Sequence, residues 1–584
     1  MTTAKITSVS GPVLKARVEQ PFQMGEAVRV GERELMGEVI RIQGQEIVVQ
    51  VYEDTSGLRP GGAVLGNGLP LAVRLGPHLL GGIFDGLLRP LTGTDSAYIE
   101  PGTVKTAPRV LPFKPGVKEG DALNAGMRFG NVQTSGGKTL QCLVPPEVNG
   151  KVARMAPGGE YAEDATLCWL DDADGAPSEL AMSHIWPVRK PRPIVERLPV
   201  AGPLLTGQRI LDALFPVAQG GKATLPGGFG TGKTVLQESL AKWCDADVIV
   251  YVGCGERGNE MSGVLQEFPA LEDPRTGRPL MERTVLIANV SNMPVAAREA
   301  STYTAVSVAE YFRDQGLHVA LMADSTSRWA EALREISGRL GELPAEAGYP
   351  AYLSSRLAAF YERAARVRTL SGDEGSVTII GAVSPAGGDF SEPVTTHTKR
   401  YVRSFWALDS ARAHARFYPA IHPLQSYSED VEALASWWQA RGDPHWSETR
   451  RRFLTLLQQQ ARLERMARIV GKDALPMRQQ LVLLCAQVVS EGFLRQSAIS
   501  PVDRYCSPER QVRMMRLLLR FNDLAEKAVE AGASVEELYA LPVVRGLQRM
   551  GEEIPEDHLD QFDSLQEQLE TDFATWTRAT ANVG

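Results

Sequence analysis

The middle of the chain, from about residue 191 to about 430, alternates short apolar runs with longer amphipathic stretches. The apolar runs are nearly continuous, which is typical of parallel strands buried on both faces. The stretch 294–315 predicts a helix that starts with proline, where a missing N–H costs nothing. This alternation predicts a parallel sheet with helices on both faces. The predicted strands are 222–225, 247–252, 283–290, 318–323 and 376–383.

The regions on either side follow other patterns, so the fold class we predict is multidomain α/β. Residues 1–70 contain short β-branched runs separated by glycines, which predict an N-terminal β-barrel. We interpret 71–110 as a connecting segment and the Gly- and Pro-dense stretch 111–190 as a β-rich insertion. Region 191–430 then follows as its own domain. Residues 431–584 have apolar positions at i, i+3, i+4 spacing, which predict a C-terminal helical bundle whose stripes form its core.

Composition excludes several classes of protein. The chain has 584 residues, is 43% hydrophobic and 23% charged, and carries a net charge of −8. These values are typical of a globular protein, and the negative net charge does not predict the basic surface that binds nucleic acid. No run of about 18 apolar residues predicts a membrane span, and the N-terminus has no signal-peptide pattern. The six cysteines lack C-x-x-C spacing, so we expect reduced thiols in a cytosolic compartment and no zinc site.

One glycine-rich stretch after the first predicted strand carries the main chemical signal. It fits G-x-x-x-x-G-K-[ST], the P-loop, and lies between a predicted strand and a predicted helix. In such a loop the backbone N–H groups surround phosphate oxygens, and the helix N-terminus adds partial positive charge. Lys233 would reach the β- and γ-phosphates, and the Thr234 hydroxyl would hold Mg²⁺. The predicted nucleotide-binding residues here are Gly227, Gly228, Phe229, Gly230, Thr231, Gly232, Lys233, Thr234 and Val235.

Charged residues follow two other predicted strands, where they would meet the phosphates. Asp324 ends an apolar strand, a position at which P-loop enzymes orient the metal. Glu256 and Glu260 lie in the loop after the second strand, at the correct edge of the sheet to position an attacking water. Position alone does not show which of the two glutamates would position the attacking water. Arg257 would neutralise charge developing on the γ-phosphate or would pair only with Glu256.

Several motifs, taken together, resemble those of one family. Over nearly its whole length the chain resembles the catalytic A subunit of vacuolar/archaeal-type (V/A-type) rotary ATPases. The insertion at 111–190 also fits, because it distinguishes catalytic A subunits from the F-type β subunits and from the non-catalytic B subunits. The matching stretches, in chain order, are 83–86, 206–209, the P-loop, 253–260, 323–330, 384–391, 417–423 and 426–428.

The resemblance implies roles for individual residues. Glu256 matches the glutamate that polarises the attacking water, which favours it over Glu260, and Arg257 matches an arginine at the γ-phosphate. Tyr418 matches an aromatic residue that stacks on adenine. A second aromatic is usual in the helical domain, but this chain has Ile499 there, where an aliphatic side chain would have to cover the base.

The resemblance also implies an assembly and an activity. Three such chains would alternate with three non-catalytic B subunits around a central rotor stalk, with peripheral stalks and a membrane ion-translocating sector. The chain would lie on the cytoplasmic side of that membrane and would hydrolyse or synthesise Mg-ATP coupled to H⁺ or Na⁺ movement. Alternatives are a hexameric nucleic-acid translocase, a secretion-export ATPase and a nucleotide-binding protein without turnover. The acidic, aromatic-poor barrel disfavours the nucleic-acid translocase, and the insertion disfavours the secretion-export ATPase. A protein without turnover is disfavoured by the intact Lys233, Glu256 and Asp324.

Overall fold

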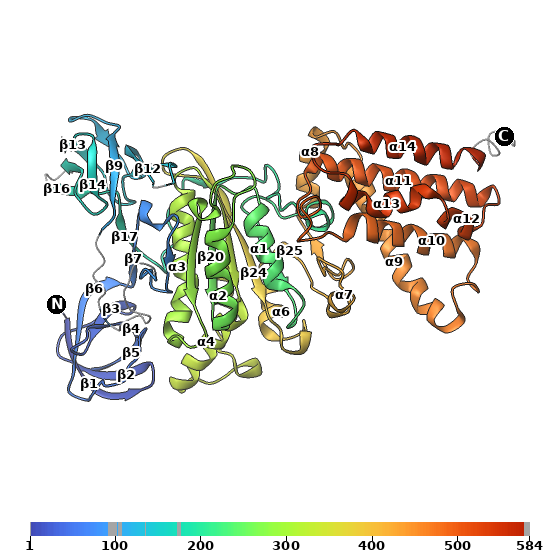
Figure 1. Ribbon diagram of the computed structural model, residues 1–584. Coiled ribbons are helices and arrows are strands. Elements are labelled where there is room, and N and C mark those ends of the chain that lie inside the picture. Colours follow the sequence, from blue (N-terminus) through green and yellow to red (C-terminus); the bar gives the residue numbers. More distant parts are fainter. Residues whose placement is uncertain (1, 92–101, 103–107, 135, 172–176, 577–584) are drawn as a thin grey trace.

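The barrel and the β-rich insertion lie together on one side of the central sheet domain, and the helical domain lies on its other side (Figure 1). The structure is a computed structural model that describes residues 2–91, 102, 108–134, 136–171 and 177–576. Part of the segment predicted to connect the barrel to the insertion lies outside these residues. The predicted fold class, with a barrel, a nucleotide-binding sheet domain and a helical domain, is confirmed.

The N-terminal domain is a closed barrel in the strand order β1-β2-β5-β4-β3-β6. Alternate residues point inward, so that Ile6, Leu14, Val39 and Val49 fill the barrel with 0–2% of their surface exposed. The strands are β1 (Thr2–Ser10), β2 (Val13–Val18), β3 (Glu26–Val30), β4 (Leu35–Gln43), β5 (Glu46–Val51) and β6 (Ala63–Pro70).

The insertion folds as two four-stranded antiparallel sheets, in the orders β10-β13-β15-β16 and β12-β11-β9-β14. A further pair, β7 with β17, joins it to the segment after the barrel. The strands are β7 (Ala72–Leu75), β9 (Val110–Pro115), β10 (Ala122–Leu123), β11 (Arg128–Gln133), β12 (Thr139–Leu143), β13 (Gly150–Met155), β14 (Gly159–Ala162), β15 (Cys168–Asp171), β16 (Pro177–Leu180) and β17 (His184–Pro187).

The central domain contains a 10-stranded sheet, in which eight strands follow the path β26-β25-β19-β24-β22-β20-β21-β8 while β23 pairs with β24 and β18 with β23. Its centre is parallel, as predicted, but β23 and β26 pair antiparallel at its margins. The segment interpreted as a connector supplies β8, which pairs with β21 at the far edge. The strands are β8 (Ile83–Phe84), β18 (Glu196–Arg197), β19 (Lys222–Pro226), β20 (Val248–Cys254), β21 (Thr284–Asn289), β22 (His318–Asp324), β23 (Ala365–Arg368), β24 (Glu374–Val383), β25 (Ser404–Phe405) and β26 (Tyr427–Ser428).

Helices cover both faces of this sheet, which explains the continuous apolar strands. Val248 and Val250 of β20 pack in one core with α3, whereas Ile249 and Tyr251 pack in the other core with α1 and α2. The helices of this domain are α1 (Lys233–Trp243), α2 (Gly258–Glu267), α3 (Val295–Arg313), α4 (Thr326–Arg339), α5 (Leu353–Tyr361), α6 (Pro393–Lys399) and α7 (Ser410–His414).

The C-terminal domain is helical, and its apolar stripes form a bundle core that is continuous with one core of the sheet domain. Among the described residues, no helix is long and apolar enough to cross a membrane. The six cysteines are all buried and free. The helices are α8 (Val431–Ala440), α9 (Trp446–Val470), α10 (Met477–Val489), α11 (Pro508–Glu530), α12 (Val535–Tyr539), α13 (Pro542–Glu553) and α14 (Gln561–Asp572).

Candidate active site

The glycine-rich loop lies between β19 and α1, at the carboxyl edge of the sheet. Gly230 and Gly232 have φ of +77° and +81°, the left-handed region that glycine adopts without strain. Lys233 is the first residue of α1, so the amino end of this helix faces the loop. The Thr231 side chain is buried and donates a hydrogen bond to the Gly228 carbonyl at 2.8 Å. Thr231 therefore stabilises the loop from within.

A pocket of about 410 Å³ opens above this loop. Its walls come from the glycine-rich loop, the loop after β20 and the loop after β24. These three segments meet because parallel strands present their carboxyl ends at one edge. Of the predicted residues, the pocket is lined by Gly228, Phe229, Gly230, Gly232, Lys233, Thr234, Val235, Glu256 and Arg257, together with the alternative Glu260. Gly227 and Thr231, which were also predicted, do not line this pocket.

Glu256 is held at the pocket wall by its backbone. The N–H of Ser291 donates to the Glu256 carbonyl at 2.9 Å, and the N–H of Gly255 donates to the Asn289 carbonyl at 2.6 Å. Gly255 has φ +73°, and a Cβ there would lie 2.7 Å from Arg328, so only glycine fits. The Oε1 atom of Glu256 is buried and has no hydrogen-bond partner among the described residues. A buried acceptor without a partner costs about 1–3 kcal/mol, and a bound water would satisfy it.

Glu260 lies one turn further, within α2. Burial and the negative charge of Glu256 raise the pKa of Glu260 above its usual value. The Arg257 guanidinium lies over the Phe229 ring, 4.9 Å from its centroid, and so covers the tip of the glycine-rich loop. Phe229 itself is 85% exposed. The structure therefore groups Glu256, Arg257 and Glu260 around one opening.

Asp324 ends β22 and does not line the pocket itself, but it lies within reach of Thr234, which does. Its Oδ2 accepts hydrogen bonds from the Thr234 hydroxyl at 3.4 Å and from the Tyr251 hydroxyl at 3.3 Å. Its Oδ1 is buried without a partner in the described part of the chain. Burial raises the pKa of Asp324 to about 6, with the Lys233 ammonium opposing and Glu256 adding to the shift. A carboxylate oxygen without a partner beside a threonine hydroxyl fits a hard cation such as Mg²⁺.

The burial of Asp324 leads to a prediction about stability. Its folded pKa of about 6 lies above the usual value of 3.8, so ionisation destabilises the nucleotide-free fold. Because each pKa unit corresponds to about 1.4 kcal/mol, this destabilisation is about 3 kcal/mol above pH 6 and vanishes below about pH 4. We expect Asp324→Asn to raise the melting temperature of the nucleotide-free chain at pH 8, with the gain disappearing towards pH 4. Melting curves at both pH values check this, and an equal or lower melting temperature at pH 8 contradicts it.

Sequence reasoning gave no role to several residues of the pocket. The Lys233 ammonium donates to the Ser384 hydroxyl, and the Ser384 N–H donates to the Ser327 hydroxyl at 2.8 Å. Arg328 also lines the pocket and pairs with Glu331 at 2.9 Å. Ser384 lies inside the motif 384–391 and Arg328 inside the motif 323–330, so these two motifs were the sequence features that could have indicated both residues.

The two residues predicted to contact the adenine base, Tyr418 and Ile499, lie away from the phosphate pocket. The Tyr418 hydroxyl is 3.1 Å from the Ser239 hydroxyl, which lies further along α1 than the glycine-rich loop. Burial raises the pKa of Tyr418 to about 12, so its phenol stays neutral. Ile499 is 90% exposed. Both assignments stay predictions, because neither Tyr418 nor Ile499 lines the phosphate pocket.

Comparison with known proteins gives matches along nearly the whole chain. Residues 6–68 match the beta-barrel domain of the ATP synthase alpha/beta family, 107–189 its barrel-sandwich domain and 207–428 its nucleotide-binding domain. Residues 435–539 match the C-terminal domain of V and A type ATP synthase. The A-type ATP synthase A subunit of Methanopyrus kandleri is 49% identical over 577 residues, 97% of this chain and 98% of that protein. The chain belongs to the family of A-type and V-type ATP synthase A subunits.

Other matches agree with this family. The A-type ATP synthase A subunit of Thermococcus kodakarensis is 52% identical, covering 94% of this chain and 95% of that protein. The V-type ATP synthase alpha chain of Halothermothrix orenii is 48% identical, covering 97% of each. The assembled ATPase EscN of an enteropathogenic E. coli type III secretion system is similar in fold, with a TM-score of 0.64 over 88% of this chain and all of that chain, but only 22% identical. Membership makes the chain the catalytic component of a rotary ATPase with several different chains, an ion-transporting ATPase that binds nucleotide.

Proposed function

We propose that Glu256 of this A subunit positions the water that attacks the γ-phosphate of Mg-ATP, and that the reverse reaction makes ATP at the same site. The observation that carries this proposal is the buried Oε1 of Glu256, which has no partner among the described residues and belongs to a side chain that lines the same pocket as Lys233. A carboxylate held at a strand end has the location that in-line attack requires. Glu260, in the first turn of α2, has no such buried oxygen without a partner among the described residues, so Glu256 fits the role better.

The remaining polar groups stabilise the phosphates. Lys233 carries its charge to the β- and γ-phosphates, and the backbone N–H groups of the glycine-rich loop surround their oxygens. Arg257, held over Phe229 at the pocket mouth, offsets negative charge that develops on the γ-phosphate. Thr234 and Asp324 would hold Mg²⁺, directly or through its water. When bound, Mg²⁺ supplies positive charge that offsets the negative charge on the phosphoryl oxygens.

The base end of the nucleotide would lie along α1. Tyr418 is tied to α1 through Ser239, which fixes the distance of its ring from the glycine-rich loop. We place the adenine against this ring, with Ile499 covering part of the other face. An exposed aliphatic side chain gives less stacking than an aromatic ring would. Ile499→Phe is the substitution that would place an aromatic ring at this contact.

The active assembly that fits this chain is a ring. Three copies would alternate with three non-catalytic B subunits around a central rotor stalk, with peripheral stalks outside. The membrane sector would move H⁺ or Na⁺, and this chain would lie on the cytoplasmic side and contact no nucleic acid. The net charge of −8 supports the last point.

The test of the proposed nucleotide site uses Lys233. Its ammonium contacts Ser384 in the structure and is the main cation that the glycine-rich loop brings to the phosphates. We expect Lys233→Ala to weaken ADP binding to the full-length chain by about 10²-fold, the order of one lost charge-assisted contact to phosphate. Calorimetric titration of wild type and variant measures this. Equal affinity in the two proteins would mean that the nucleotide binds elsewhere.

A further inference from the structure

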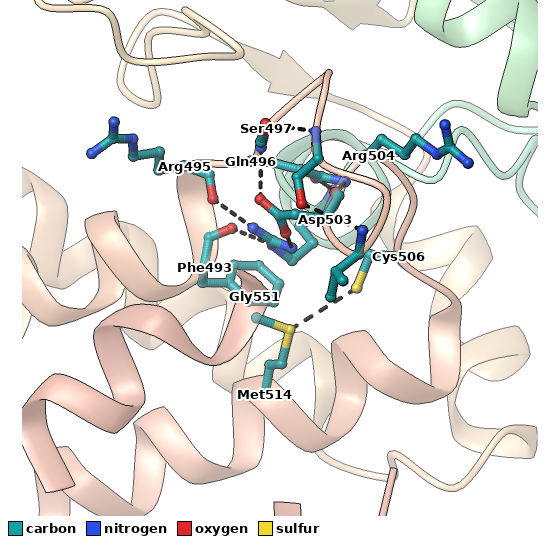
Figure 2. A network of polar contacts seen from close by, with 12 residues as sticks. Phe493, Arg495, Gln496, Ser497, Asp503, Arg504, Cys506, Met514 and Gly551 are labelled. Carbon is teal, nitrogen blue, oxygen red and sulfur yellow. Dashed lines mark hydrogen bonds and ion pairs between the residues drawn. The ribbon is translucent and has the colours of Figure 1, made fainter. Parts of the chain in front are cut away.

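A buried arginine connects the sheet domain to the helical domain close to α1. Arg209, in the segment between β18 and β19, has 1% of its surface exposed. Its guanidinium donates to the Phe493 carbonyl at 2.7 Å, to the Arg495 carbonyl, and to Asp503 Oδ1 at 2.5 Å. The three acceptors come from a single stretch of the helical domain, and Phe493, Arg495 and Asp503 are labelled in Figure 2. Such a convergence fixes the path of that stretch.

The same stretch holds Arg209 and its neighbours in return. Gln496 accepts from the Arg209 backbone N–H at 2.8 Å, and its amide donates to the Gly207 carbonyl at 2.8 Å. The amide also donates to the Asp503 carbonyl at 2.9 Å, and Asp503 Oδ2 accepts from the Ser497 N–H at 2.6 Å. Gln496 and Asp503 are only 1% and 2% exposed. These contacts close residues 496–503 into a fixed loop, which we call the 496–503 loop.

The 496–503 loop is tied directly to the proposed base end. The Gln496 N–H donates to the Tyr418 carbonyl at 2.8 Å, and the Tyr418 hydroxyl contacts Ser239 on α1. Just beyond the loop, the Tyr505 ring stacks on Trp243 at the end of α1, with 5.4 Å between centroids. Ile499 lies within the loop. The path of the loop therefore sets where Tyr418 and Ile499 lie relative to the phosphate pocket.

We propose that Arg209 is a positioning residue for the base of the nucleotide, acting with Gln496 and Asp503 through the 496–503 loop. Arg209 is not expected to touch the nucleotide. Its role is to fix the loop so that Tyr418 and Ile499 form a rigid site for the adenine. This inference rests on the proposed function, because it takes Tyr418 as the base contact.

Asp503→Asn is the sharpest change to this network. The two carboxylate oxygens of Asp503 each accept one hydrogen bond, one from Arg209 and one from Ser497. An asparagine keeps the shape but has one acceptor, so its NH₂ group would face either the guanidinium or the Ser497 N–H. One of the two contacts must break, and the loop loses its fixed path while both domains keep their cores.

The matched control is Asp314→Asn. Asp314 Oδ2 accepts from Arg192 at 2.6 Å and its Oδ1 accepts from Arg313 at 2.6 Å, so both of its carboxylate oxygens are held by hydrogen bonds, as those of Asp503 are. It lies before β22, at the opposite end of the strands from the pocket. A purely structural role for both pairs would give both variants the same nucleotide affinity.

The experiment titrates the full-length wild type, Asp503→Asn and Asp314→Asn with ADP and separately with pyrophosphate, which has no base. We expect Asp503→Asn to bind ADP about tenfold more weakly, as one lost charged hydrogen bond implies, with pyrophosphate affinity unchanged. Asp314→Asn should match wild type with both ligands. Equal ADP affinity in all three proteins, or an equal loss of both ligands in Asp503→Asn, would overturn the inference.

A second variant and one control keep the result decisive. If Asp503→Asn does not fold, Ser497→Ala replaces it, since it removes the acceptor of the Ser500 N–H at 3.0 Å within the same loop. It should weaken ADP alone, and unchanged ADP affinity would overturn the inference. Lys233→Ala reports on the proposed function, because it should weaken ADP and pyrophosphate together. If wild type binds neither ADP nor pyrophosphate, the proposed function is contradicted. If wild type binds both and the loop variant binds ADP equally well, only the inference is contradicted.

Discussion

ATP turnover by this chain is expected to rise about 10³–10⁵-fold when it is assembled with its neighbours, compared with the isolated full-length chain. The reason is the charge available in its own pocket. Of the two arginines among the described residues that line it, Arg328 pairs with Glu331 at 2.9 Å, which leaves Arg257 to offset the charge on the γ-phosphate. We propose that a neighbouring chain of the assembly supplies the further positive charge that one chain lacks in the transition state. The measurement is kcat at saturating Mg-ATP for both forms.

The control for this comparison is nucleotide affinity. The isolated chain already has the glycine-rich loop, Lys233 and Thr234 in place, so it should bind ADP with an affinity close to that of the assembly. An isolated chain that turns over at the rate of the assembly would show that its own residues complete the site. Lys233→Ala in the assembly gives the background rate.

The second large effect is expected from Glu256→Gln in the assembled enzyme. Glutamine keeps the size of the side chain but has lost the basic oxygen that holds the attacking water. A general base contributes about 10²–10⁴-fold, so kcat should fall by this factor while KM changes little. The steady-state rate over a range of ATP concentrations measures both parameters.

Glu260→Gln is the matched comparison for that result. Both glutamates follow β20 and both line the pocket, but only Glu256 has a buried carboxylate oxygen without a partner among the described residues. We therefore expect Glu260→Gln to lose less activity than Glu256→Gln. A larger loss in Glu260→Gln would transfer the water-positioning role to Glu260.

The phosphate side of the site was predictable because its chemistry is local in sequence. The glycine-rich loop, Lys233 and Thr234 follow one another, and Glu256 and Asp324 each lie at the end of a strand whose apolar pattern is plain. Parallel strands bring such ends together without further information. For the same reason the five long strands β19, β20, β21, β22 and β24 were predicted with bounds within two residues of those observed, whereas the short strands β8, β18, β23, β25 and β26 were not predicted.

Other features could not be read from the sequence because they depend on distant contacts. Arg209 and Asp503 are 294 positions apart, and no spacing rule connects them. The strand β8 is only two residues long, too short for an alternating pattern, yet it extends the central sheet. The contact of Lys233 with Ser384 likewise joins two motifs that the sequence presents separately. Tertiary packing, rather than local propensity, decides each of these.

The most direct test of the central claim, that Glu256 positions the attacking water, is the identity of the nucleotide trapped by the assembled enzyme. Wild type and Glu256→Gln are loaded with Mg-ATP, freed of unbound nucleotide and quenched in acid, and the bound ATP and ADP are separated. We predict mostly ADP in wild type and mostly intact ATP in Glu256→Gln, because the variant still binds the phosphates through Lys233. Mostly ADP in both, formed at equal rates, would contradict the role of Glu256.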